Sequence, residues 1–209
     1  MPAVVEFPTV VRHASDQFGD LFGGRPQRRH FAEYLTGLMI ATNKTVTGIN
    51  AEFAETTDQS CLNRFLTHAA WDEQALNERR LGLLQQDPST RYDKGGVIAV
   101  DNVLVDHDGE LIEDVGWFWD HVEQRHKIAH DYLFANYVAP SGKHYPLEFR
   151  RFKKRDQCEA SGEAFEDHGV LFRQLVDWVC EREIPGDFTF DSYFSSAETQ
   201  STSWRNSTP

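Results

Sequence analysis

A chain of 209 residues has room for one full domain and a smaller one, and its 40% hydrophobic and 12% aromatic content excludes wholesale disorder. It has no run of the roughly 18 apolar residues that a membrane-spanning helix needs and no secretory signal, so we expect a cytoplasmic protein without a membrane partner. The net charge of -12 argues against simple electrostatic attraction to nucleic acid, and the three cysteines are expected to be free thiols.

The first 92 residues predict an irregular lead-in followed by a helical domain. Residues 1–24 show little periodicity and end in two glycines, and Pro26 then suits a first helical position. Apolar residues recur at helical spacing from Phe31 to Met39. Three further helices are expected. One covers 45–53, the next begins after a cap at Thr57 or Asp58, and the last runs from Trp71 to about Gln86. We therefore predict a helical domain over residues 25–92.

After Gly95-Gly96 the pattern changes to strands. Residues 97–105 read VIAVDNVLV, an apolar β-branched run that is typical of a strand covered on both faces. Further strands are expected at about 127–138 and 144–152, followed by a helix at about 165–183 and a short strand at 188–190. The chain is therefore predicted to be α+β, with a mixed sheet over residues 93–198 and an unstructured tail over 199–209.

Two aspartates stand out against this pattern. Asp101 interrupts the first strand and Asp191 directly follows the last one. An aspartate in an apolar strand is costly without a partner, and bonding to a nearby loop is the simpler alternative. If the last strand lies beside the first and parallel to it, the two carboxylates meet. Adjacent carboxylates on a rigid sheet suit a pair of Mg²⁺ ions, which can activate water and stabilise a leaving oxygen.

Three segments resemble the insertion-sequence transposases of the DDE superfamily: GGVIAVDNVLVDHDGELIEDVGWFWDH, KIAHDYLFANYVAPSGKHYPLEFRRFKK and FTFDSYFSS. In that family the first catalytic Asp follows an apolar strand and precedes Asp-Thr or Gly-Thr. Asp101 stands at that position, although Asn102 and Val103 depart from the motif. The second catalytic Asp ends the fourth strand before a small residue and an aromatic one, as in Asp191-Ser192-Tyr193.

The resemblance covers roughly residues 27–198 and implies a ribonuclease-H-like core of order β-β-β-α-β. It implies cleavage and strand transfer at the ends of a DNA element, with Asp101 and Asp191 as catalytic ligands of Mg²⁺ or Mn²⁺. The implied partners are the terminal repeats and target DNA, and a homodimer or a mixed oligomer with full-length transposase. The implied location is a prokaryotic cytoplasm, at the nucleoid when the protein is bound to DNA.

The family's third acidic residue, a Glu on a helix well beyond the fourth strand, has no counterpart here. Glu198 is the only acidic residue after Asp191, and it lies too close to that strand. We therefore expect a C-terminally truncated, incomplete ribonuclease-H-like sheet with impaired cleavage. The alternatives are a non-enzymatic DNA-end-binding fragment that regulates a full-length transposase, and a pseudogene product that folds poorly.

Basic residues predict the DNA contacts. Family resemblance implies an N-terminal domain that binds element ends, with a helix-turn-helix reader between residues 44 and 84; ordinary packed helices with a solvated face are the alternative. A dense basic cluster after the third strand predicts phosphate contacts, with a solvated turn as the alternative. The candidate residues are Arg28, Arg29, Lys44, Arg64, Arg79, Arg80, Arg150, Arg151, Lys153 and Lys154.

The acidic residues are concentrated in the second half of the chain. Residues 93–209 hold 22 of the 33 acidic residues and 12 of the 21 basic ones, and only six basic residues in the whole chain are lysines. This composition is halophile-like, because it is the one that we expect in a cell of high internal salt, where counterion release contributes little to phosphate binding.

Three other patterns are interpreted as structural. Residues 106–109 are expected to form a turn and not a calcium loop, since Leu111 stands where that loop needs glycine and Trp117 where it needs glutamate. His126 and His130 lack a third convergent ligand for zinc. The aromatic run 117–119 is expected to make core or subunit contacts, with stacking on a flipped base as the alternative.

Overall fold

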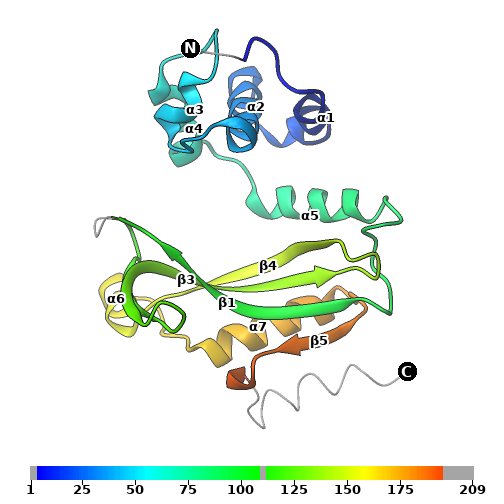
Figure 1. Ribbon diagram of the computed structural model, residues 1–209, viewed down its shortest axis with the longest axis vertical. Coiled ribbons are helices and arrows are strands. Elements are labelled where there is room, and N and C mark those ends of the chain that lie inside the picture. Colours follow the sequence, from blue (N-terminus) through cyan, green and yellow to red (C-terminus); the bar gives the residue numbers. More distant parts are fainter. Residues whose placement is uncertain (1–3, 109–111, 195–209) are drawn as a thin grey trace. The chain divides into compact units, whose positions relative to one another are not determined.

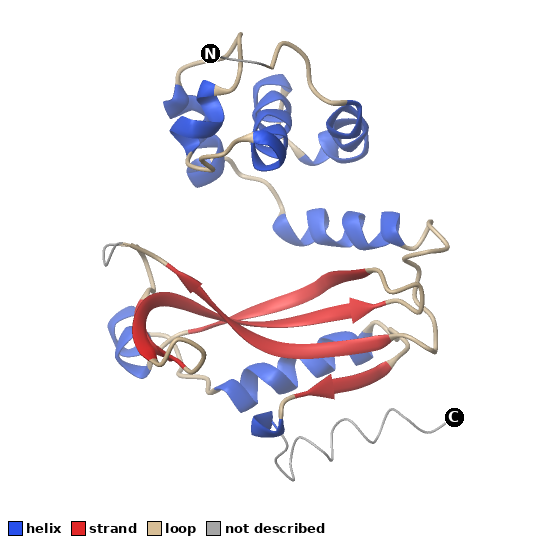
Figure 2. Cartoon of the chain, in the orientation of Figure 1, coloured by secondary structure: helices blue, strands red, loops and turns tan. Residues whose placement is uncertain are grey.

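The computed structural model describes residues 4–108 and 112–194. The chain forms two compact units, with the division after Leu83. Figure 2 shows helices in the first unit and helices together with a sheet in the second. The α+β class is therefore confirmed. The tail expected at 199–209 and Glu198 lie outside the described residues. In the described part of the chain, no helix has the length and apolar character needed to cross a membrane.

The first unit is built from helices whose ends follow local signals. Asp58 caps α4 by accepting a hydrogen bond from Ser60 N, and Thr45 caps α3 by accepting one from Gly48 N. Pro26 occupies the first turn of α2, as its fixed φ angle favours. The helices are α1 (Thr9–Phe18), α2 (Arg25–Ile40), α3 (Val46–Ala51), α4 (Gln59–His68) and α5 (Glu73–Leu84), with a 3₁₀ turn η1 (Gly19–Leu21).

Helix α1 differs from the irregular lead-in that we predicted for residues 1–24. Val11 and Phe18 stand seven residues apart with Ala14 between them, which is the spacing of one helical face. Val11 is 1% exposed, and Phe18 contacts the ring of Phe31 on α2. The local pattern is short, so packing against α2 supplies the stability that the isolated segment lacks.

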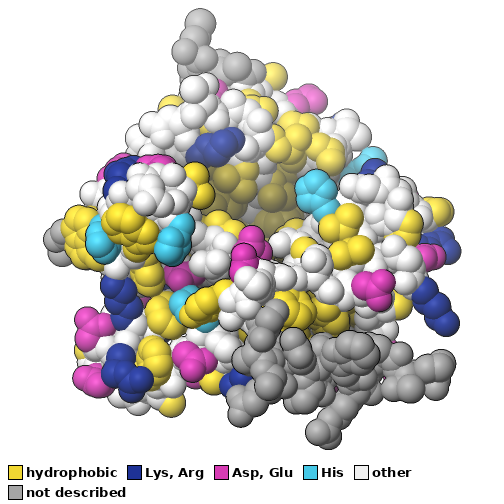
Figure 3. Space-filling view, turned by 60° about the horizontal axis from the view of Figure 1, so that its bottom comes forward, with side chains coloured by type: hydrophobic (Ala, Val, Ile, Leu, Met, Phe, Trp, Pro, Cys, Tyr) yellow, Lys and Arg dark blue, Asp and Glu magenta, His cyan; other side chains and the backbone are white. Residues whose placement is uncertain are grey.

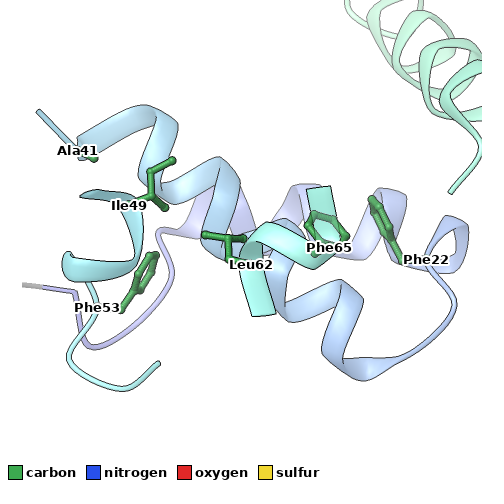
Figure 4. Close-up of a cluster of buried hydrophobic side chains, with 6 residues drawn as sticks. All are labelled: Phe22, Ala41, Ile49, Phe53, Leu62 and Phe65. Carbon is green, nitrogen blue, oxygen red and sulfur yellow. The ribbon is translucent and has the colours of Figure 1, made fainter. Parts of the chain in front are cut away.

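One hydrophobic cluster holds the helices of the first unit together. Its buried members come from helices and loops far apart in the chain, and Figure 4 shows their side chains directed into a common interior. Ile49 is fully buried and Leu62 is 1% exposed. Burying side chains of this size contributes roughly 1.5–3 kcal/mol each. The cluster consists of Phe22, Ala41, Ile49, Phe53, Leu62 and Phe65.

The second unit is a mixed sheet with helices, as Figure 1 shows. Strand β1 lies between β3, which is antiparallel to it, and β5, which is parallel to it; β2 and β4 both pair with β3. The elements are β1 (Val97–Asp106), β2 (Gly116–Asp120), β3 (Arg125–Val138), β4 (His144–Phe152), α6 (Arg155–Ser161), α7 (His168–Glu181), β5 (Asp187–Phe190) and a 3₁₀ turn η2 (Ser192–Phe194). The predicted order β-β-β-α-β therefore lacked β2 and α6.

One face of this sheet is packed against α7. Residues that pair on neighbouring strands share a face, so Val100, Ala135 and Phe190 lie together. Phe172 of α7 meets Phe190 edge-on, with ring centroids 5.0 Å apart. We expected β1 to be covered on both faces, but the described residues leave its other face partly open. Val103 is 45% exposed and Val105 is 40% exposed on that face.

A buried lysine ties three acidic residues together at one end of the sheet. Lys127 is 8% exposed, and its Nζ lies 2.7 Å from Asp120, 2.5 Å from Glu123 and 3.0 Å from Asp106. The hydrogen bond from Lys127 is the main reason that the pKa of Asp120 falls to about 2. The same group of contacts raises the pKa of Lys127. This cluster makes folding sensitive to acid.

We expect the stability that this cluster supplies to be lost between roughly pH 4 and pH 2. A carboxyl group with a lowered pKa stabilises the fold above its unfolded value, near 3.9, and ceases to do so as the pH falls through its folded value, about 2 for Asp120. Urea unfolding at pH 7 and pH 3 tests this. Lys127→Met should show a smaller loss than the wild type, whereas Lys94→Met, which removes an exposed lysine, should show the wild-type loss. Equal losses in all three proteins would contradict the assignment.

Candidate metal centre and basic surface

The two aspartates stand at neighbouring positions on two parallel strands, with Asp101 in the middle of β1 and Asp191 directly after the end of β5. The β1–β5 ladder pairs Val97 with Asp187 and ends with Val100 opposite Phe190. Asp101 and Asp191 are the next residues on their strands, so they directly follow this last pair. The topology therefore brings together two residues that are 90 positions apart in the sequence.

A glycine turn allows β5 to approach β1. Gly186 has a φ of +142°, which side chains rarely adopt, and an added Cβ would lie 2.8 Å from the carbonyl oxygen of Gly96. Asp187 N donates a hydrogen bond to that same oxygen at 3.0 Å. The Pro185-Gly186 pair therefore ends the preceding segment and starts the ladder in the register that leads to Asp191.

Each carboxylate is oriented by local hydrogen bonds that leave one oxygen available. Oδ1 of Asp101 accepts from Asn102 N at 2.9 Å. Oδ1 of Asp191 accepts from Tyr193 N at 2.8 Å and from Ser192 Oγ at 3.2 Å. Both residues are exposed, and neither forms an ion pair with any described residue. The site therefore presents two ionisable carboxylates that the described part of the chain does not neutralise.

This donor set suits a hard divalent cation. Carboxylate oxygens are the ligands that Mg²⁺ prefers, and a cation would relieve the repulsion between two neighbouring negative charges. Within residues 4–108 and 112–194, no group of three His, Cys, Asp or Glu residues is placed to hold a metal. Two protein carboxylates are thus the complete set that the described residues offer.

Buried aromatic packing anchors the segment that carries Asp191. Phe194 is 4% exposed and its ring stacks on Phe172 of α7, with centroids 5.0 Å apart and planes at 16°. Phe194 N also donates to the carbonyl oxygen of Asp191 at 3.0 Å. Asp191 therefore begins a short turn, η2, that rests on α7.

The basic cluster of the second unit is largely occupied by acidic partners. Arg151 lies 2.5 Å and Lys153 lies 3.1 Å from Asp114, and Lys153 also pairs with Glu163 at 2.9 Å. The contact with Glu163 is the main reason that the pKa of Lys153 is raised. Lys154 donates to the carbonyl oxygen of Trp117 and lies over the ring of Phe118. Arg150 pairs with Glu148 at 3.3 Å.

Several predicted DNA contacts in the helical unit also have partners within that unit. Arg79 forms a two-point contact with Asp20, both at 2.9 Å, which lowers the pKa of that carboxyl group. Arg29 bonds to the buried Glu33 and to the carbonyl oxygen of Glu55. Arg28, Lys44 and Arg64 are exposed; Lys44 donates to Leu38 O and Arg64 to Cys61 Sγ, while Arg80 donates to Asn77.

The surface view agrees with this picture of paired charges. On the face drawn in Figure 3, basic side chains are scattered among acidic and hydrophobic ones and form no continuous basic area. DNA contacts through Arg29, Arg79, Arg150, Arg151 or Lys153 would therefore compete with the ion pairs of these residues. The sequence did not reveal the pairs whose acidic partner comes from a distant segment, such as Asp20 for Arg79 and Asp114 for Arg151.

Comparison with known proteins adds the chemistry to this geometry. The family described as DDE superfamily endonuclease matches residues 17–179, which is most of the chain. The chain belongs to the DDE superfamily of endonucleases. No curated protein matches it. Membership indicates a nuclease that acts on DNA, and the superfamily generally uses divalent metals such as Mg²⁺. The match includes Asp101 and ends before Asp191.

Proposed function

We propose that this chain is the transposase of a DNA insertion element, and that Asp101 and Asp191 hold its catalytic Mg²⁺ or Mn²⁺. The observation that supports this most directly is the parallel ladder in which Val100 lies opposite Phe190. The next residue on each strand is an exposed aspartate without an ion-pair partner among the described residues. Two acidic residues at neighbouring positions can share metal ions of the kind that a DDE endonuclease generally uses.

The sheet supports a ribonuclease-H-like core. A central β1 with antiparallel β3 on one side and parallel β5 on the other is the arrangement that such a core requires. Helix α7 connects β4 to β5 across one face of the sheet (Figure 1), as a crossover between strands on opposite sides of β1 must do. We therefore propose that the sequence resemblance extends to the fold type.

The proposed chemistry divides between the cation and the chain. When bound, Mg²⁺ would polarise the scissile phosphate and lower the pKa of an attacking water. The chain contributes two carboxylates whose Oδ1 atoms are held by backbone N–H groups of Asn102 and Tyr193. These bonds orient the remaining oxygens before a ligand arrives, which reduces the cost of organising the site.

We further propose that the 209-residue chain cleaves DNA weakly. Two carboxylates complete fewer coordination positions than three, and a third acidic ligand is absent from the described residues around Asp101 and Asp191. We propose terminal repeats and target DNA as partners, a homodimer or a mixed oligomer as the working form, and a prokaryotic cytoplasm as its location.

Nicking of a supercoiled plasmid that carries the element's own ends tests this proposal. With Mg²⁺ or Mn²⁺, we expect slow conversion to open circles that EDTA stops, because two ligands still hold the ion loosely. The matched reaction uses the same plasmid without the ends. Rapid nicking would contradict the proposed impairment. Binding to the ends that is indifferent to metal, with no nicking, would favour a non-enzymatic DNA-end-binding regulator instead.

A further inference from the structure

A buried carboxylate on β3 bonds to the first residue of α7. Asp131 of β3 is 3% exposed and stands opposite Leu104 on β1 and Phe152 on β4. Its Oδ2 accepts a hydrogen bond from His168 Nε2 at 2.8 Å, while its buried Oδ1 has no hydrogen-bond partner among the described residues. A buried carboxylate with a single partner is costly, so packing alone does not account for it.

The partner, His168, is held in one orientation. It is the first residue of α7, and its ring stacks on Phe152 with centroids 4.0 Å apart and planes at 16°. The stacking sets the plane of the ring, and the hydrogen bond to Asp131 sets its rotation within that plane. An ionised carboxylate can only accept, so with Asp131 ionised Nε2 of His168 is the donor in this bond.

The third neighbour of His168 connects it to the candidate metal centre. Its ring meets the edge of Tyr193, with centroids 6.2 Å apart and planes at 80°. Tyr193 belongs to η2, and its backbone N–H donates to Asp191 Oδ1 at 2.8 Å. Helix α7 therefore supports η2 at two points, through Phe172 beneath Phe194 and through His168 beside Tyr193.

We infer that the Asp131–His168 pair is a positioning device, which holds η2 and thereby orients the carboxylate of Asp191. This inference rests on the proposed role of Asp191 as a metal ligand. Residues that orient a metal ligand without touching the metal typically contribute 10- to 100-fold to metal affinity. His168 acts through Tyr193 rather than directly, so we expect roughly the lower end of that range.

A purely structural role is the alternative, in which the pair only ties β3 to α7. Tyr137→Phe provides a matched control, because Tyr137 also lies on β3, is fully buried, and donates through Oη to the carbonyl oxygen of Asp93 at 2.9 Å. This variant removes the two hydrogen bonds between Tyr137 Oη and the backbone of Asp93 without touching η2. Both roles predict lower stability for His168→Ala, so stability alone does not separate them.

Amide hydrogen exchange without metal gives the first test. His168→Ala should speed the exchange of the amides of Tyr193 and Phe194, which donate to Asp191, more than global destabilisation explains. Tyr137→Phe should leave these two amides at the protection that its own stability predicts. If both variants alter η2 only in proportion to their stability, the inference is wrong.

Binding of Mn²⁺ to the free protein, followed by electron paramagnetic resonance, gives the second test. We expect His168→Ala to weaken binding about tenfold and His168→Gln, which retains a donor for Asp131, to restore part of it. Tyr193→Ala, at a 73% exposed position that carries little folding risk, should weaken binding and be non-additive with His168→Ala. Unchanged affinity in these variants overturns the inference. Absence of Mn²⁺ binding in the wild type instead overturns the proposed function, and the exchange test still decides whether His168 holds η2.

Discussion

Asp101→Asn and Asp191→Asn should each weaken Mn²⁺ binding by more than roughly 100-fold. Loss of a residue that only orients a metal ligand typically weakens binding 10- to 100-fold, and loss of the ligand itself should cost more. The reason is that each aspartate supplies half of the protein carboxylates that the described residues offer at this site. Asn retains the shape and the hydrogen bond from Asn102 or Tyr193 but removes the charge. Calorimetric titration with Mn²⁺ measures the change.

The same substitutions should not lower the folding stability of the metal-free protein. Two neighbouring carboxylates without a described cationic partner repel one another, so removing one charge should leave stability unchanged or raise it slightly. Asp187→Asn is the matched control, because Asp187 is exposed on the same strand, β5, but at its other end, opposite Val97. Equal loss of Mn²⁺ binding in the control, or none in Asp101→Asn and Asp191→Asn, would remove these aspartates from the site.

Gly37→Ala should destabilise the helical unit by about 1–3 kcal/mol, although Ala favours helices by about 1 kcal/mol over Gly. Gly37 lies within α2, and an added Cβ would meet Cγ2 of the fully buried Ile49 at 2.2 Å and Cγ1 at 2.7 Å. That overlap forces α3 or the Ile49 side chain to move within a packed core. Urea denaturation, followed by far-UV circular dichroism, measures the loss.

A double-mutant cycle identifies Ile49 as the cause. Ile49→Ala alone should cost roughly 2–5 kcal/mol, because it leaves a cavity in the cluster of Figure 4. In the double variant the two costs should not add, since the shortened side chain makes room for the new methyl group. Gly82→Ala is the control, because nothing lies within 4 Å of a Cβ at that helical position. Strict additivity would show that the strain at Gly37 has another source.

Much of the secondary structure followed from local patterns, and the exceptions have physical reasons. The strand predicted at 144–152 coincides with β4, and Asp58 caps α4 as its side chain allows. Strand β2 (Gly116–Asp120) was missed because five residues give little alternation to read, and pairing with β3 supplies its stability. The expected coverage of β1 on both faces was wrong for the described residues, since apolar composition does not say which face another element will cover.

Part of the candidate site could be predicted from local sequence patterns, and the rest depends on contacts between distant segments. Asp101 and Asp191 could be singled out from the sequence, because a charged residue within or directly after an apolar strand is a local anomaly. Asp131 also interrupts a predicted strand, but nothing in the sequence pointed to its partner, because His168 is 37 positions away and is ordinary in its own segment. The ion pairs of Arg79 and Arg151 were invisible for the same reason.

The sequence by itself determined where most helices and strands form, because caps, turn residues and apolar spacing act within a few residues of chain; α1, β2 and α6 were the exceptions. It also singled out two acidic residues at strand positions where an unpaired charge is costly. Only the tertiary structure decided that β5 lies beside β1, which cations have partners, and what supports η2. These depend on contacts between segments far apart in the chain, whose energies arise only when the whole core packs.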